Sequence, residues 1–142
     1  MSGDRYFVDT NVILYTYDTK SSRKRERAET WLRWLWEHAA GAISWQVLQE
    51  FYWNAVQKFG ADPTTARKHV TLLCELGPPE MTLGMMERAW FWTDQASVSF
   101  WDALIVAAAE RARCRWLLSE DFQPGREFGG ITVVNPFEAV PH

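Results

Sequence analysis

The chain has 142 residues, 47% of them hydrophobic, and a formal net charge of −3. This length predicts one domain over residues 1–142, while the composition excludes a disordered chain and the acidic balance excludes a grip on nucleic acid through bulk charge. Because no leader-like segment and no apolar run of about 18 residues is present, we expect a soluble, cytoplasmic protein without membrane contact.

The first half of the chain predicts two short strands and four helices, bounded by capping residues and glycines. The opening strand ends at Asp9, and Thr10 and Asn11 can begin a helix directly after it. Ser22 and Ser44 are predicted to cap two long helices. The predicted ranges are a strand at 6–8, a short helix from about residue 12, a helix at 23–40 ended by Gly41, a strand at 42–43, a helix at 45–59 ended by Gly60 and a helix that starts at Asp62-Pro63 and runs to 76.

The second half predicts a short strand near Met81, two helices and two further strands. Its most apolar segment is the helix over residues 100–112. The remaining predicted elements are a helix at 83–93, a strand at 115–118, a turn at 122–125 and a strand at 131–134. Because strands and helices alternate, the sequence predicts an α/β fold with a mostly parallel sheet and helices on both faces.

Four acids fall where such a sheet would bring them together. Asp9 and Asp121 each follow a predicted strand, Asp102 lies in the first turn of the most apolar helix, and Glu50 lies on the helix at 45–59. In open α/β sheets, ligands bind beyond the carboxyl ends of the strands. The four acids are therefore candidates for one site.

Each acid also has an ordinary structural explanation. Asp9 could cap the next helix, and Glu50 could be a solvated helix position. Asp102 fits a capping box begun by Ser99. Asp121 could be a loop acid, with its neighbour Glu120 an equal candidate. Taken singly, none of these residues identifies a function.

Three motifs and one isolated acid together resemble a known family. The motifs are FVDTNVI at residues 7–13, WDALI at 101–105 and LSEDF at 118–122, and Glu50 stands in the second acid position. They look like the motifs of PIN-domain nucleases, and most closely those of VapC-type toxins of bacterial and archaeal toxin–antitoxin pairs. The resemblance spans nearly the whole chain and implies a PIN-like three-layer α/β/α sandwich.

The resemblance implies a metal-dependent endoribonuclease, the toxin of a type II pair, that hydrolyses RNA phosphodiester bonds. Clustered carboxylates repel one another unless a cation neutralises them, and oxygen ligands of this kind suit Mg²⁺, for which Mn²⁺ can substitute. Such an ion can activate water and offset charge on the phosphate. The family assigns the fourth acid to Asp121, with Glu120 as the lesser candidate. The implied catalytic and metal-binding residues are Asp9, Glu50, Asp102 and Asp121, with Thr10, Asn11 and Ser119 as substrate or supporting contacts.

Other functions remain open. The alternatives are a PIN nuclease of RNA processing that is no toxin, and a PIN-like RNA-binding or interaction module without catalysis. An aspartyl phosphatase would place a second aspartate where this chain has Asn11, and no Gly-x-Ser-x-Gly or Walker motif is present. The expected partners are an RNA substrate, a cognate antitoxin and a second copy of the chain, with a tetramer or larger assembly when antitoxin is bound.

Aromatic and basic residues predict where those partners bind. Nine tryptophans are more than one small core can hold, so some should lie at an interface. We expect a dimer face on the helix at 83–93, around Trp90, Phe91 and Trp92 with Met85 or Met86. The helix at 23–40 should border an antitoxin groove, shared with the helix of Glu50. Its tryptophans are Trp31, Trp34 and Trp36, and its basic first turn, with Arg23, Lys24, Arg25 and Arg27, should remain for RNA phosphates.

The histidines and cysteines carry no part of this chemistry. His38, His69 and His142 lie outside the motifs, and we expect them on the surface. Cys74 and Cys114 are far apart and lack zinc-ligand spacing, so they are expected to be free, buried thiols.

Overall fold

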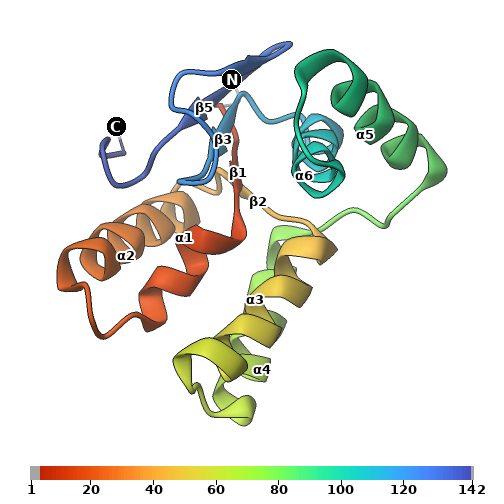
Figure 1. The fold of residues 1–142 in the computed structure, drawn as a ribbon. Coiled ribbons are helices and arrows are strands. Elements are labelled where there is room, and N and C mark those ends of the chain that lie inside the picture. Colours follow the sequence, from red (N-terminus) through yellow and green to blue (C-terminus); the bar gives the residue numbers. More distant parts are fainter. Residues whose placement is uncertain (1–3, 142) are drawn as a thin grey trace.

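The computed structural model describes residues 4–141, which form a five-stranded sheet between helices (Figure 1). The strands are β1 (Tyr6–Val8), β2 (Gly41–Ala42), β3 (Trp116–Leu118), β4 (Glu127–Phe128) and β5 (Ile131–Val134), and they lie in the order β2-β1-β3-β5-β4. All neighbouring pairs are parallel except β4 and β5. Phe7, Leu117 and Val133 are in register on adjacent strands and are buried. The carboxyl ends of β1 and β3 therefore meet at one edge of the sheet.

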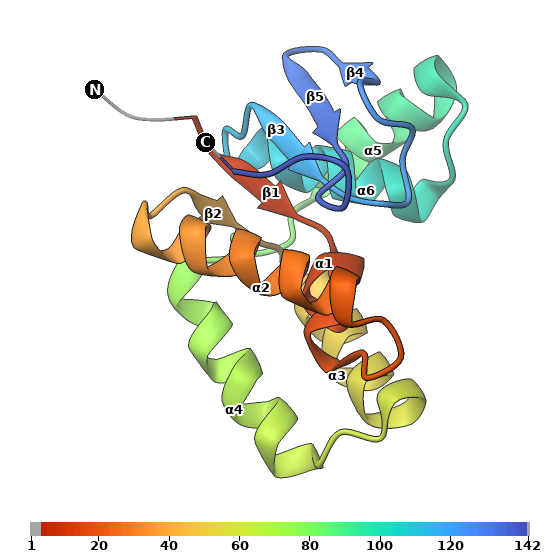
Figure 2. The same ribbon diagram turned by 90° about the vertical axis from the view of Figure 1, so that its left-hand side faces the viewer.

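Six α-helices and two 3₁₀ turns accompany the sheet within the described residues. In Figures 1 and 2, α1 and α2 cover one face and α5 and α6 the other, while α3 and α4 form a hairpin that projects away from the sheet. This arrangement confirms the predicted three-layer α/β/α fold. The helices are α1 (Thr10–Leu14), α2 (Ser22–Glu37), α3 (Trp45–Phe59), α4 (Pro63–Leu73), α5 (Leu83–Ala96) and α6 (Phe100–Arg111), and the 3₁₀ turns are η1 (Tyr15–Tyr17) and η2 (Cys74–Leu76).

Local capping explains where several of the helices begin and end. The side chains of Ser44, Asp62 and Ser99 each accept a hydrogen bond from a backbone N–H in the first turn of the helix that follows. Gly60 ends α3 in the left-handed conformation, with φ of 66°. Each of these residues lies next to the helix end that it defines, and the range predicted for α3 is confirmed.

Other predicted boundaries are wrong. Ser21, not Ser22, caps α2, and the helix ends at Glu37, so Gly41 lies in strand β2 instead of ending the helix. Two adjacent serines offer the same cap, and their order is decided by where the helix docks. No strand forms at Met81, which lies in an exposed loop. Strand β4 was not predicted, because two residues are defined as a strand only by pairing with β5.

The core gathers around the sheet and α6. Residues 103–109 of α6 are all buried, as the apolar sequence of this helix predicts. Trp31 and Trp92 are buried, whereas five tryptophans are well exposed, which confirms that the core does not hold them all. The exposed ones are Trp36, Trp45, Trp53, Trp90 and Trp101. Within residues 4–141, no helix is long and apolar enough to cross a membrane.

The expectation of surface histidines holds for one of the two that the structure describes. His38 is exposed. His69 is half-buried, because its ring stacks on Tyr17 and meets Phe51 edge-on, and burial lowers its pKa. His142 lies outside the described residues. Both cysteines are free thiols; Cys114 is buried and Cys74 is half-buried.

Candidate active site

Asp9 occupies the carboxyl end of β1 and caps α1. One carboxylate oxygen accepts from the Thr10 backbone N–H at 2.7 Å, and the other accepts from the Ser119 hydroxyl at 2.7 Å. Only 6% of the residue is exposed. Desolvation raises the pKa of Asp9 to about 6, although the hydrogen bonds from Ser119 and Thr10 oppose this and the charges of Asp121 and Glu50 add to it. The sequence expectation of a cap is met, and the same carboxylate also faces other acids.

Asn11 joins the ends of β1 and β3. Its side-chain Nδ2 lies 3.3 Å from Asp9 Oδ2, 3.3 Å from Ser119 Oγ and 3.1 Å from Asp121 Oδ2. Its Oδ1 accepts from the backbone N–H of Glu120 at 3.2 Å. An amide has two N–H donors, so Nδ2 is shared among three acceptors. Asn11 therefore holds two carboxylates near each other without adding charge.

Ser119 also links Asp9 to Asp121. It is fully buried and follows β3 directly. Its hydroxyl donates to Asp9 and accepts from the Asp121 backbone N–H at 3.0 Å. Both roles of the hydroxyl are used, so Ser119 orients the acids and is not open to substrate.

Glu50 reaches the site from α3. Its Oε1 accepts from the Thr10 hydroxyl at 2.7 Å, across 40 positions of sequence. Thr10 itself is buried. The sequence placed Thr10 among the substrate or supporting contacts, and its hydroxyl is the support for Glu50.

Asp102 lies in the first turn of α6, where its backbone N–H donates to the Ser99 hydroxyl at 3.1 Å. The predicted cap therefore forms. Desolvation raises the pKa of Asp102, Ser99 lowers it, and the charges of Asp121 and Glu50 raise it further. Its carboxylate thus lies within electrostatic range of two other acids of the site.

Glu120 points elsewhere. Its carboxylate accepts from Lys24 Nζ at 2.6 Å and from the Tyr15 hydroxyl at 2.6 Å. Asp121 is exposed and contacts Asn11. Of the two neighbouring acids, the geometry places Asp121 with the cluster and Glu120 in a separate ion pair.

We define the acid cluster as Asp9, Glu50, Asp102 and Asp121. Its donors are carboxylate oxygens, which suit hard cations such as Mg²⁺ and Mn²⁺, and the raised pKa values of Asp9 and Asp102 reflect burial and mutual repulsion that a cation would relieve. In this donor chemistry the cluster fits a divalent ion. Within residues 4–141, no group of three histidine, cysteine, aspartate or glutamate side chains is arranged so that it could hold a metal ion.

The four basic side chains at the start of α2 also make contacts within the chain. Lys24 is paired with Glu120, and Arg25 donates to the carbonyl of Asp18. Arg23 donates to the Phe137 carbonyl, while Arg27 donates to the carbonyls of residues 136 and 139. Only Lys24 pairs with an acid, whereas the three arginines donate to neutral carbonyls and keep their charge and further N–H donors, so it remains a prediction that this turn binds RNA phosphates.

The groove beside α2 also differs from the prediction. A cavity of about 270 Å³ lies between α2 and the α4–η2 segment, lined by Trp36, Leu72 and Leu76 among others. The helix of Glu50 packs against α1 and α4 instead of forming this wall. Trp34 does not line the cavity; its ring stacks on His38 at 4.2 Å.

One residue near the acids was not predicted from the sequence. Gln46 lies one turn before Glu50 on α3, and its Nε2 donates to the Trp101 carbonyl at 3.3 Å, next to Asp102. The spacing of four residues between Gln46 and Glu50 is the signal that could have found it, because such residues share a helix face.

The comparisons with known proteins agree with this geometry. A family profile described as "PIN domain" matches residues 6–125. The fold is similar to a structure described as a toxin–antitoxin complex from Klebsiella pneumoniae, with a TM-score of 0.68 and 19% identity over 92% of this chain and 97% of that one. It is also similar to Mycobacterium tuberculosis VapC20, described as a sarcin-ricin loop cleaving toxin, with a TM-score of 0.59 and 21% identity over 82% and 91% of the two chains. The comparison with curated proteins gives no match.

Proposed function

Since this chain belongs to the PIN domain family, we propose that it is a metal-dependent endoribonuclease and the toxin of a type II toxin–antitoxin pair. The observation that carries the proposal is the acid cluster, in which, besides desolvation, the charges of Asp121 and Glu50 raise the pKa values of both Asp9, at the end of β1, and Asp102, on α6. Similarity of fold to a toxin–antitoxin complex and to an RNA-cleaving toxin supports it.

In this proposal, Asp9, Asp102 and Asp121 hold a Mg²⁺ ion, for which Mn²⁺ can substitute, and Glu50 assists them. The bound ion would supply an activated water and a counter-charge for the phosphate. The chain's own contribution is to position the carboxylates. Asn11 and Ser119 fix Asp9 relative to Asp121, and Thr10 fixes Glu50.

Control by an antitoxin follows from the same charges. A basic side chain of a partner placed among Asp9, Glu50 and Asp102 would replace the charge of the metal. We therefore expect antitoxin and divalent metal to compete. The apolar part of the antitoxin would occupy the cavity between α2 and α4, where Trp36 is half-exposed.

The test is cleavage of single-stranded RNA by the purified chain with EDTA, Mg²⁺ or Mn²⁺. Cleavage should need metal and should be abolished in Asp9→Asn and Asp102→Asn. The matched control is Asp94→Asn on α5, which removes an exposed carboxylate outside the cluster. Activity that survives both EDTA and Asp102→Asn would reject the proposal, and metal-dependent RNA binding without cleavage would favour the non-catalytic module.

A further inference from the structure

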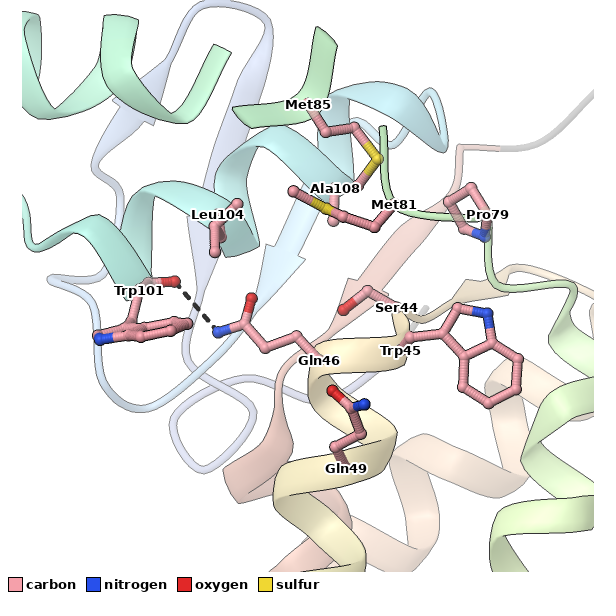
Figure 3. A pocket seen from close by; sticks show the side chains of 10 residues that line it. All are labelled: Ser44, Trp45, Gln46, Gln49, Pro79, Met81, Met85, Trp101, Leu104 and Ala108. Atoms are coloured by element: carbon pink, nitrogen blue, oxygen red, sulfur yellow. Dashed lines mark hydrogen bonds between the residues drawn. The ribbon is translucent and has the colours of Figure 1, made fainter. Parts of the chain in front are cut away.

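A cavity of about 260 Å³ opens between the start of α3, the start of α6 and the loop before α5 (Figure 3). Trp45 and Trp101 flank it on opposite sides of Gln46, while Met81 and Leu104 line its apolar wall. None of the residues that line it, as far as positions 4–141 describe it, carries a charge. It differs in this from the cavity between α2 and α4, which includes Arg33.

The cavity adjoins the acid cluster through two of its own residues. Gln46 shares a helix face with Glu50 and donates to the Trp101 carbonyl, and Trp101 directly precedes Asp102. Gln49 of the cavity directly precedes Glu50. A group bound in the cavity would therefore be adjacent to the carboxylates, within the reach of one molecule.

The side chains of the cavity have the chemistry that recognises a nucleobase. Trp101 is 64% exposed and offers an open aromatic face, on which a base can stack. The side-chain amide of Gln49 makes no hydrogen bond within the described residues, and Gln46 keeps its amide oxygen as a free acceptor. Glutamine amides can pair with the polar edges of a base. Met81 is flexible enough to adapt to purine or pyrimidine.

We infer that this cavity binds an unpaired nucleobase of a single-stranded RNA and so sets which bond the acid cluster cleaves. The inference rests on the proposed function, because the bound base selects a bond only if the acid cluster cleaves the phosphodiester next to that base. The uncharged cavity offers a phosphate no opposite charge, and the carboxylates repel the phosphate when metal is absent. The base must therefore supply attraction that the backbone of the RNA does not.

The experiment uses fluorescein-labelled single-stranded hexamers and measures their binding to the full chain in EDTA by fluorescence anisotropy. One hexamer of each base is compared with a hexamer of abasic ribose phosphate. All of them meet the same repulsion from the acids, so the difference isolates the base. We expect the abasic hexamer to bind about tenfold more weakly than the best base, and Trp101→Ala to remove most of this difference.

Trp53→Ala is the matched control, since Trp53 is 62% exposed on α3 but does not line the cavity. It should leave the difference unchanged. Gln46→Ala and Gln49→Ala should alter the order of preference among the four bases while retaining the stacking contribution.

Equal binding of abasic and base-containing hexamers by the wild-type chain would overturn the inference. So would conversion of a dimer to a monomer by Trp101→Ala with base discrimination intact, which would assign the cavity to a second copy. If Trp101→Ala loses antitoxin binding while base discrimination is intact, the cavity is assigned to the antitoxin instead. If hexamers are discriminated but no RNA is cleaved with Mg²⁺ or Mn²⁺, the proposed function fails and the base site stands.

Discussion

The Thr10 hydroxyl donates to the Glu50 carboxylate at 2.7 Å and so ties the start of α1 to the middle of α3. The α3–α4 hairpin projects from the sheet (Figure 2), and this bond is where its acid is fixed to the sheet edge. Thr10→Val keeps the shape of the side chain and removes the donor. We expect it to weaken metal affinity or cleavage by about 10- to 100-fold, as for other groups that orient ligands.

Thr10→Ser retains the hydroxyl and is the control, with near wild-type metal affinity expected. The measurement is the rise in melting temperature on titration with Mn²⁺, compared among the three proteins. A full metal response in Thr10→Val would show that Glu50 needs no support.

The raised pKa of Asp9 predicts how stability changes with pH. The folded chain binds this proton more tightly than the unfolded chain, so stability falls as the pH rises from about 4 to about 6 and stays lower above that. A pKa raised from 3.8 to about 6 corresponds to roughly 3 kcal/mol. Asp102 acts in the same direction. In metal-free buffer, Asp9→Asn should melt higher than wild type at pH 7 and show a flatter profile, recorded by calorimetry between pH 4 and 8.

The two acids after Ser119 should respond differently to neutralisation. Asp121→Asn is expected to abolish cleavage, whereas Glu120→Gln should retain it. Glu120 contributes instead through Lys24, and its loss should lower the free energy of unfolding by at most about 1 kcal/mol because both side chains are partly exposed. Urea unfolding and cleavage assays on both variants decide this. Cleavage lost in Glu120→Gln alone would exchange the roles.

Trp36 lines the cavity between α2 and α4, whereas Trp34 packs against the core, so substitutions at the two positions should have different effects. Trp36→Ala should lower antitoxin affinity by more than about 2 kcal/mol, as for a buried aromatic anchor, while cleavage and melting temperature are retained. Trp34→Ala should lower the melting temperature, because this ring packs against Tyr6 and Trp31. Calorimetric titration with the antitoxin measures the first effect. Unchanged affinity in Trp36→Ala would place the antitoxin elsewhere.

The dimer face on α5 remains a prediction, with half-buried Met86 rather than buried Met85 beside it. Trp90 and Phe91 are exposed, whereas Trp92 is buried edge-on against Phe128. Trp90→Glu should convert a dimer to a monomer, as measured by light scattering at tens of micromolar without antitoxin. Trp53→Glu, on α3, should leave the dimer intact. A wild-type monomer under these conditions would contradict the prediction.

The features that could be predicted from the sequence are those that depend on residues close together in the chain. Caps at Ser44, Asp62 and Ser99 depend on a few positions, and the buried strands follow from apolar runs. The alternation of strands and helices was enough to predict a mostly parallel sheet. The resemblance to the family's motifs identified the four acids as candidates for one site. The electrostatic influence of the acids on one another required the structure.

What depends on distant residues could not be predicted. One such feature is the ion pair of Glu120 with Lys24, which lies 96 positions away in the chain; only the family motif favoured Asp121 over Glu120. The groove beside α2 lies elsewhere than predicted, because its second wall is formed by α4 and not by the helix of Glu50. Strand β4 exists only through pairing with β5. Each of these follows from docking that no local pattern records.

The C-terminal segment is held by the same helix that carries the basic turn. Trp31 donates its indole N–H to the carbonyls of Pro136 and Ala139, and Arg23 and Arg27 bind the same stretch. The carbonyls fix the position of these guanidinium groups but leave their positive charge in place, so each can still neutralise a phosphate and release a counterion. This face should therefore contribute to the slope of log affinity against log salt, and Arg23→Gln should make that slope shallower.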